Sequence, residues 1–242
     1  MTVSPHLNEL LETLWPGSDT SSGSPDVRLV ALPNPRSPRV VLPGRPWRVS
    51  AGALRHYRTS ATGVRRVAAE AGSLGLRAGL GELMPGRLRR PAADGIGAHL
   101  CDVLDRQVHV SLYVGPQRAV QKPVLQVLDD TGRPIAFAKL AVNPLTTGLI
   151  RHEAAALELL RDAGLGSVRV PRILHRGEWH SRELLVQEAL VPTGRAEVAP
   201  PLLVAAAREI SRVGGHHDHD LTDNPYVAQL RARVAALPPR PP

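Results

Sequence analysis

The fold of this chain is decided by three runs, VHVSLYV at Val108–Val114, PVLQVL at Pro123–Leu128 and IAFAKLA at Ile135–Ala141. Their β-branched and aliphatic residues predict three strands. Asp129–Gly132, between the second and third runs, has the composition of a hairpin turn. An antiparallel sheet is therefore expected here.

The same segment continues with one helix and two more strands. A helical pattern of apolar residues starts at Thr146 or Thr147 and ends near Ala163. Two strands are predicted after it, at Pro171–Trp179 and Glu183–Leu190. The expected fold is an α+β lobe with a five-stranded antiparallel sheet and one crossing helix.

Lys139 is the only charged residue in the third strand, so it needs an anionic partner or an exit to solvent. Glu153, in the early middle of the predicted helix, is a candidate partner. In kinase-type lobes a strand lysine contacts the α- and β-phosphates and a helix glutamate holds it. A simple structural ion pair is the alternative.

A family resemblance rests on three phrases, KPVL at Lys122–Leu125, AFAK at Ala136–Lys139 and RHEAAAL at Arg151–Leu157. With the order of elements, they resemble the N-terminal lobe of the aminoglycoside/choline-type phosphotransferases, which are small-molecule relatives of protein kinases. The resemblance covers about a third of the chain. It implies a kinase-like fold and an ATP-binding site.

The resemblance also implies roles for individual residues. Lys139 would bind the phosphates and Glu153 would hold it in place. The backbone of Glu188, Ala189 and Leu190 would contact the adenine edge where the last strand leaves the lobe.

The phosphate loop departs from the Gly-rich loop of protein kinases. Residues 115–119 contain the single glycine Gly115. Arg118 or Lys122 replaces backbone amides at the phosphates, or each is a solvated turn residue, and the sequence leaves both interpretations open. We therefore expect ATP to be held weakly, and Mg²⁺ only together with ATP.

A catalytic loop is not recognisable. The family uses His-Gly-Asp with Asn five residues after the Asp, followed by a metal-binding Asp. The nearest similar segment is Gly214–Asn224, where Asp223 stands five residues after Asp218 and Pro225 five after Asp220. We expect no catalytic residue, and a truncated, catalytically incomplete phosphotransferase-like protein whose acceptor substrate is not visible.

A metal site is one interpretation of the three histidines in that segment, His216, His217 and His219. Adjacent ligands in a polar loop rarely converge on one ion. We favour a solvated linker between two amphipathic helices, Pro201–Val213 and Pro225–Leu237, and expect no metal site.

Four regions are expected along the chain: an N-terminal helix and flexible linker (1–26), a basic, mainly helical extension (27–104), the kinase-like lobe (105–192), and a linker with partial helices (193–242). The first region includes a helix at His6–Trp15. The extension includes a short hairpin between Val27–Leu32 and Arg39–Leu42.

The net charge of +8 and the arginines between Arg45 and Arg90 favour anionic partners. A nucleic-acid or membrane-surface protein is one interpretation. A solvated helical face in an Arg-rich bacterial proteome is the other, and we favour it because aromatic stacking residues are sparse. The expected partners are a nucleotide and a protein that replaces the missing lobe, with no specific nucleic acid.

Cys101 is the single cysteine, lies in a predicted amphipathic helix, and is expected to pack in the core. The sequence shows no secretory signal and no membrane span, so a cytoplasmic protein is expected. A non-catalytic nucleotide- or protein-binding module remains the main alternative to a phosphotransferase.

Overall fold

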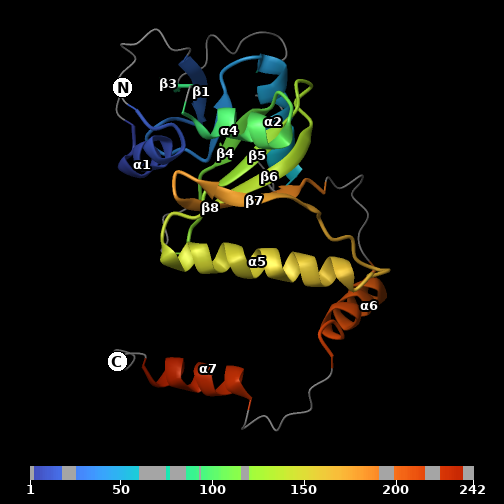
Figure 1. Ribbon diagram of the computed structural model, residues 1–242. Coiled ribbons are helices and arrows are strands. Elements are labelled where there is room, and N and C mark those ends of the chain that lie inside the picture. The colour runs from blue at the N-terminus through green and yellow to red at the C-terminus, as the bar shows by residue number, and fades with distance from the viewer. Residues whose placement is uncertain are drawn as a thin grey trace.

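A computed structural model describes residues 3–17, 26–59, 75–76, 86–92, 94–115, 120–190, 199–215 and 224–236. Within them the chain is α+β, with six helices and eight strands (Figure 1). The helices are α1 (Pro5–Leu14), α2 (Trp47–Thr59), α4 (Ile96–Leu104), α5 (Pro144–Asp162), α6 (Pro200–Ser211) and α7 (Pro225–Ala235). The strands are β1 (Asp26–Leu32), β2 (Val40–Pro43), β3 (Arg87–Pro91), β4 (His109–Tyr113), β5 (Val124–Leu128), β6 (Pro134–Leu140), β7 (Ile173–Trp179) and β8 (Arg182–Glu188).

All eight strands belong to one antiparallel sheet in the order β3-β1-β2-β4-β5-β6-β8-β7. Five of them, β4 to β8, are the strands predicted for the lobe, and β1 and β2 are the strands of the predicted hairpin. The predicted strand count of five is wrong for the sheet, because β1, β2 and β3 extend it. Strand β2 joins the two parts by pairing Val40 with Tyr113 and Val41 with Leu112.

The extension predicted as mainly helical with a short hairpin contains that hairpin, β1 and β2, together with α2 and α4, and it adds the strand β3, which the sequence does not predict. The hairpin of β1 and β2 can be predicted from its own residues. The pairing of β2 with β4 cannot, because it joins residues about seventy positions apart in the sequence. Strand β3 reads Arg-Leu-Arg-Arg-Pro, which favours solvent rather than a sheet. It is a strand because it pairs with β1, with Leu29 opposite Leu88.

Helices cover both faces of the sheet. The largest core lies on one face, where leucines of α1 and Ile96 and Leu100 of α4 pack against alternate strand residues such as Ala138 and Leu184. On the other face α2 packs over one part of the sheet through Val49. Helix α5 covers another part of that face and lies along β7 and β8 (Figure 1).

Helix α5 starts earlier than the sequence predicts. Asn143 is its N-cap: the Asn143 side chain accepts from the Thr146 amide at 2.9 Å, and the Asn143 amide donates to the Thr146 hydroxyl at 3.0 Å. Pro144 follows the cap, where a missing N–H costs nothing. The chain leaves the helix at Gly164, which has a φ of +62° that glycine adopts freely.

Two described arginines of the basic extension make side-chain hydrogen bonds within the molecule. Arg90 donates to the side chain of Asn8 at 2.8 Å, and Arg48 donates to the carbonyl of Asp130 at 2.8 Å. These contacts agree with a structural role for both residues. Residues 60–74 of the basic extension lie outside the described residues. None of the described helices is both long enough and apolar enough to cross a membrane.

Candidate functional site

Lys139 and Glu153 meet between the sheet and α5. Ala138 and Leu140 point into the largest core, so Lys139, between them on β6, projects from the opposite face. Its Nζ forms an ion pair with Oε1 of Glu153 on α5. The two side chains are 15% and 27% exposed, so both are partly desolvated but reachable from solvent. The predicted pairing of strand lysine and helix glutamate is confirmed.

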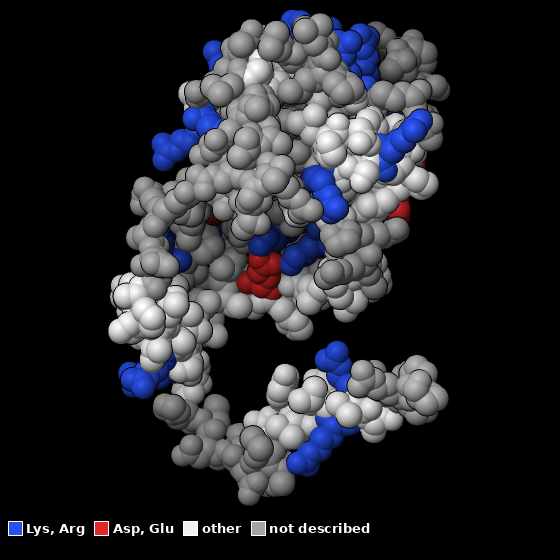
Figure 2. Space-filling view, turned by 180° about the vertical axis from the view of Figure 1, so that it is seen from behind, with Lys and Arg blue, Asp and Glu red and all other residues white. Residues whose placement is uncertain are grey.

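Two further residues complete this group. Lys122, just before β5, places its Nζ 2.5 Å from Oε2 of Glu153. Gln187 on β8 accepts from the Lys139 ammonium at 3.3 Å. We call Lys122, Lys139, Glu153 and Gln187 the lysine cluster. The face of the molecule drawn in Figure 2 has a hollow in which basic and acidic side chains lie together.

The sequence analysis assigned no role to Gln187. Its position is diagonal to Lys139 across the β6–β8 pairing, and this proximity becomes known only once the two strands are paired.

The charges of the lysine cluster do not cancel. Burial alone would raise the pKa of the Glu153 carboxyl, but the hydrogen bonds and positive charges of Lys122 and Lys139 outweigh it, and the pKa lies below its usual value. At neutral pH one carboxylate therefore faces two ammonium groups. The excess positive charge in a partly desolvated position favours an anion.

The backbone predicted to contact adenine is already engaged. The amide of Glu188 donates to the carbonyl of Arg172 at 2.8 Å, and the amide of Ala189 donates to the carbonyl of Ile135 at 3.1 Å. An adenine edge would have to use carbonyl groups here or the backbone of Leu190. The structure thus places these three residues at the end of β8 but does not leave the first two amides open.

The Glu188 side chain also has a structural partner. Its carboxylate pairs with Arg169 at 3.1 Å and with Arg172 at 3.4 Å. Burial alone would raise the pKa of Glu188, but the hydrogen bonds from Arg172 and the charges of both arginines hold it below its usual value.

The loop predicted to bind phosphates, residues 115–119, is described only at Gly115. The carbonyl of Gly115 accepts from the side chain of Gln121 at 3.2 Å, which closes the two ends of the β4–β5 connection. Arg118 lies outside the described residues, and its role stays a prediction. The histidines at 216–219 also lie outside them. Among the residues that are described, no three His, Cys, Asp or Glu side chains come together as metal ligands would.

The comparisons with known proteins do not identify a family for this chain. No family model matches the sequence, and no curated protein does. A crystal structure from Haemophilus somnus 129PT, named "Putative fructosamine-3-kinase", is similar to part of the chain, with 16% identity and a TM-score of 0.35. The match covers 50% of this chain and 39% of that protein's length. A likeness at this TM-score does not identify a fold or an activity, so the family resemblance rests on the residues of the chain.

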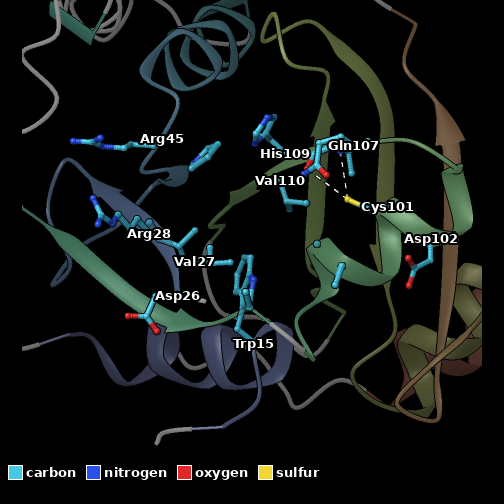
Figure 3. A pocket seen from close by; sticks show the side chains of 16 residues that line it. Trp15, Asp26, Val27, Arg28, Arg45, Cys101, Asp102, Gln107, His109 and Val110 are labelled. Carbon is cyan, nitrogen blue, oxygen red and sulfur yellow. Dashed lines mark hydrogen bonds between the residues drawn. The ribbon is translucent and has the colours of Figure 1, made fainter. Parts of the chain in front are cut away.

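A separate cavity of about 630 Å³ opens where β1 and β2 diverge from β4. Figure 3 shows Arg28 and Arg45 on one side of it, Cys101 and Asp102 on the other, and Trp15 below. Cys101 packs against the largest core, as expected, and its sulfur accepts from the Val108 amide at 3.4 Å.

Two titratable side chains that line this cavity, Asp26 and His109, have partners elsewhere. Asp26 lies 3.9 Å from Arg89, and His109 lies 2.9 Å from Asp130. The volume suits a small ligand, but a binding site also needs polar groups that converge on the ligand. We therefore do not assign a function to this cavity.

Proposed function

We propose that residues 105–192 bind a nucleoside triphosphate through its phosphates, as the ATP-binding half of a phosphotransferase of the aminoglycoside/choline type. The observation that carries this proposal is the contact between Lys139 on a central strand and Glu153 on the helix that crosses it. An unsupported lysine would sample many rotamers. The ion pair fixes its ammonium and keeps it charged, which is what phosphate binding requires.

The proposal assigns binding and not transfer. The segment Gly214–Asn224 departs from the family's catalytic spacing, so no residue is assigned as acceptor base or magnesium ligand. Mg²⁺ would enter only with the nucleotide. The acceptor substrate is not assigned.

The expected affinity is low. The amides of Glu188 and Ala189 donate within the protein, so adenine gains little from them. The phosphate loop contains one glycine, so few amides can approach the phosphates. We expect a dissociation constant near the millimolar range, or ~4 kcal/mol of binding free energy.

Thermal denaturation with increasing ATP and Mg²⁺ tests the proposal, because a ligand that binds only the folded chain raises its melting temperature. Lys139→Met should remove the shift, since it keeps the apolar stem and deletes the charge. Arg161→Met is the matched control: it makes the same charge change on the last turn of α5, where Arg161 pairs with its exposed neighbour Asp162 at 3.4 Å.

The control should keep the ATP-induced shift. An equal loss in both variants would mean that ATP is attracted nonspecifically to a chain of charge +8. In that case the proposed site is wrong, although the fold stands.

A further inference from the structure

Lys122 is not a solvated turn residue. Its side chain is 20% exposed, and its ammonium lies 2.5 Å from the carboxylate of Glu153. Each oxygen of Glu153 thus holds one lysine, Oε1 holding Lys139 and Oε2 holding Lys122. Removing Lys122 would still leave Glu153 with a counter-ion, so its ion pair is not needed to neutralise the glutamate.

Three glutamates of the lobe each hold two cationic side chains. Glu183 is shared by Arg151 and Arg176, Glu188 by Arg169 and Arg172, and Glu153 by Lys122 and Lys139. The four arginines are 41% to 76% exposed, whereas the two lysines are 15% and 20% exposed. The first two sites show how this chain builds a purely structural pair: it uses arginine.

The composition of the chain strengthens the contrast between the arginine pairs and the lysine pairs. The sequence holds 28 arginines and two lysines, and both lysines bind the same glutamate. Arginine has a planar fork that matches a carboxylate, so it suits a permanent pair. Lysine carries a compact charge with three donors on a flexible stem, and it can move between a carboxylate and a phosphate oxygen. The use of lysine at this one place points to an exchangeable partner.

We propose that Lys122 is a second phosphate-binding residue, and that the phosphate chain of a nucleoside di- or triphosphate replaces Glu153 as its partner. This inference rests on the proposed function. Lys139 stays with Glu153 because it lies within β6 and is also held by Gln187. Lys122 lies outside the strands, before β5, and is free of that restraint.

Lys139 and Lys122 would then both bind phosphate groups of the same ligand. Lys122 supplies the donors that backbone amides supply in a Gly-rich loop, which this chain lacks. A ligand with one phosphate cannot engage both ammonium groups as fully as one with two or three. The site should therefore prefer ATP and ADP to AMP.

Calorimetric titration of the full chain with ATP and with AMP tests this inference. Lys122→Met should weaken ATP binding about tenfold and change AMP binding less than twofold. Lys139→Met should weaken both ligands, and Arg161→Met neither.

The outcomes separate the two proposals. If Lys139→Met weakens ATP binding and Lys122→Met does not, the role of Lys122 is wrong and the nucleotide site stands. If neither variant changes ATP binding, both proposals fall. An equal loss of ATP and AMP affinity in Lys122→Met would show that Lys122 only supports the fold.

A second measurement uses the unmodified chain and does not depend on how a variant folds. With two lysines in the sequence, reductive methylation followed by peptide mass spectrometry reports each one separately. ATP should lower the labelling of Lys122 at least fivefold relative to AMP at the same concentration. Equal labelling in the two nucleotides, or faster labelling with ATP, would overturn the inference.

Discussion

Arg151 on α5 places its Nε 2.8 Å from Oε2 of Glu183 on β8, on the side of the helix away from Glu153. Two residues along an α-helix are separated by a rotation of about 200°, so Arg151 and Glu153 leave α5 in nearly opposite directions. One flank of the helix is tied to β8 and the other to β6. The placement of Glu153 therefore depends on both contacts.

Arg151→Met should destabilise the fold by about 1 kcal/mol, because the 9%-exposed carboxylate of Glu183 would keep only the 3.5 Å contact with Arg176. Urea unfolding measures this loss. Arg161→Met, which removes an exposed contact between chain neighbours, should cost close to nothing. Adding Glu183→Gln to Arg151→Met should recover part of the loss. Equal effects of the two arginine variants would show that the α5–β8 pair adds no stability.

Gly148→Ala and Gly52→Ala should change stability in opposite directions. Gly148 lies within α5 with open space around it, so alanine should stabilise the helix by up to about 1 kcal/mol. A Cβ at Gly52 would overlap the carbonyl of Gly132 in the β5–β6 turn, and the strain should cost about 1–3 kcal/mol. Denaturant midpoints check both values. A neutral Gly52→Ala would mean that α2 does not pack closely on this turn.

Mild acidification should lower the free energy of unfolding, because His99 takes up a proton less readily in the folded chain than in the unfolded chain. Burial and the nearby His175 lower the pKa of His99, with a smaller contribution from His180, while Asp102 acts in the opposite direction. The two rings, on α4 and β7, are 6.1 Å apart. The unfolded chain therefore takes up this proton first, near a pH of about 6.5, and stability decreases as pH falls from there toward the lower folded pKa.

Melting temperatures at pH 7.5 and 5.5 measure this effect. His99→Leu should reduce the difference between the two temperatures, whereas His152→Gln, at an exposed position of α5, should leave it unchanged. A full pH dependence in His99→Leu would place the responsible group elsewhere.

Local pattern was sufficient for much of the fold. The alternation in Ile135–Ala141 identifies β6, and helical spacing of apolar residues identifies α5. Lys139 could be paired with Glu153 in advance because a charge inside an apolar strand needs a partner, and Glu153 lies in the early middle of the next helix, where kinase-type lobes carry the partner glutamate. The start of α5 was placed too late because Asn143 caps through a side chain that periodicity does not register.

Contacts between distant segments were not predictable in this way. Neither β2 nor β4 carries a residue that specifies the other as its neighbour, so no local signal showed that the hairpin and the lobe form one sheet. The engaged amides of Glu188 and Ala189 follow from the paths of β6 and β7, which only the folded chain fixes. Lys122 likewise reaches Glu153 because tertiary structure brings together residues 31 positions apart.

The arginines of β3 also affect whether two molecules can associate through the edges of their sheets. If the sheet stopped at β4, that apolar strand would offer a row of backbone donors and acceptors to any other extended chain. Strands β1 and β2 cover it, and the described sheet ends instead at β3, with Arg87, Arg89, Arg90 and Pro91. Charge and proline on an outermost strand oppose the addition of a further strand from a second molecule. The basic extension thus opposes edge-to-edge association at the β3 end of the sheet.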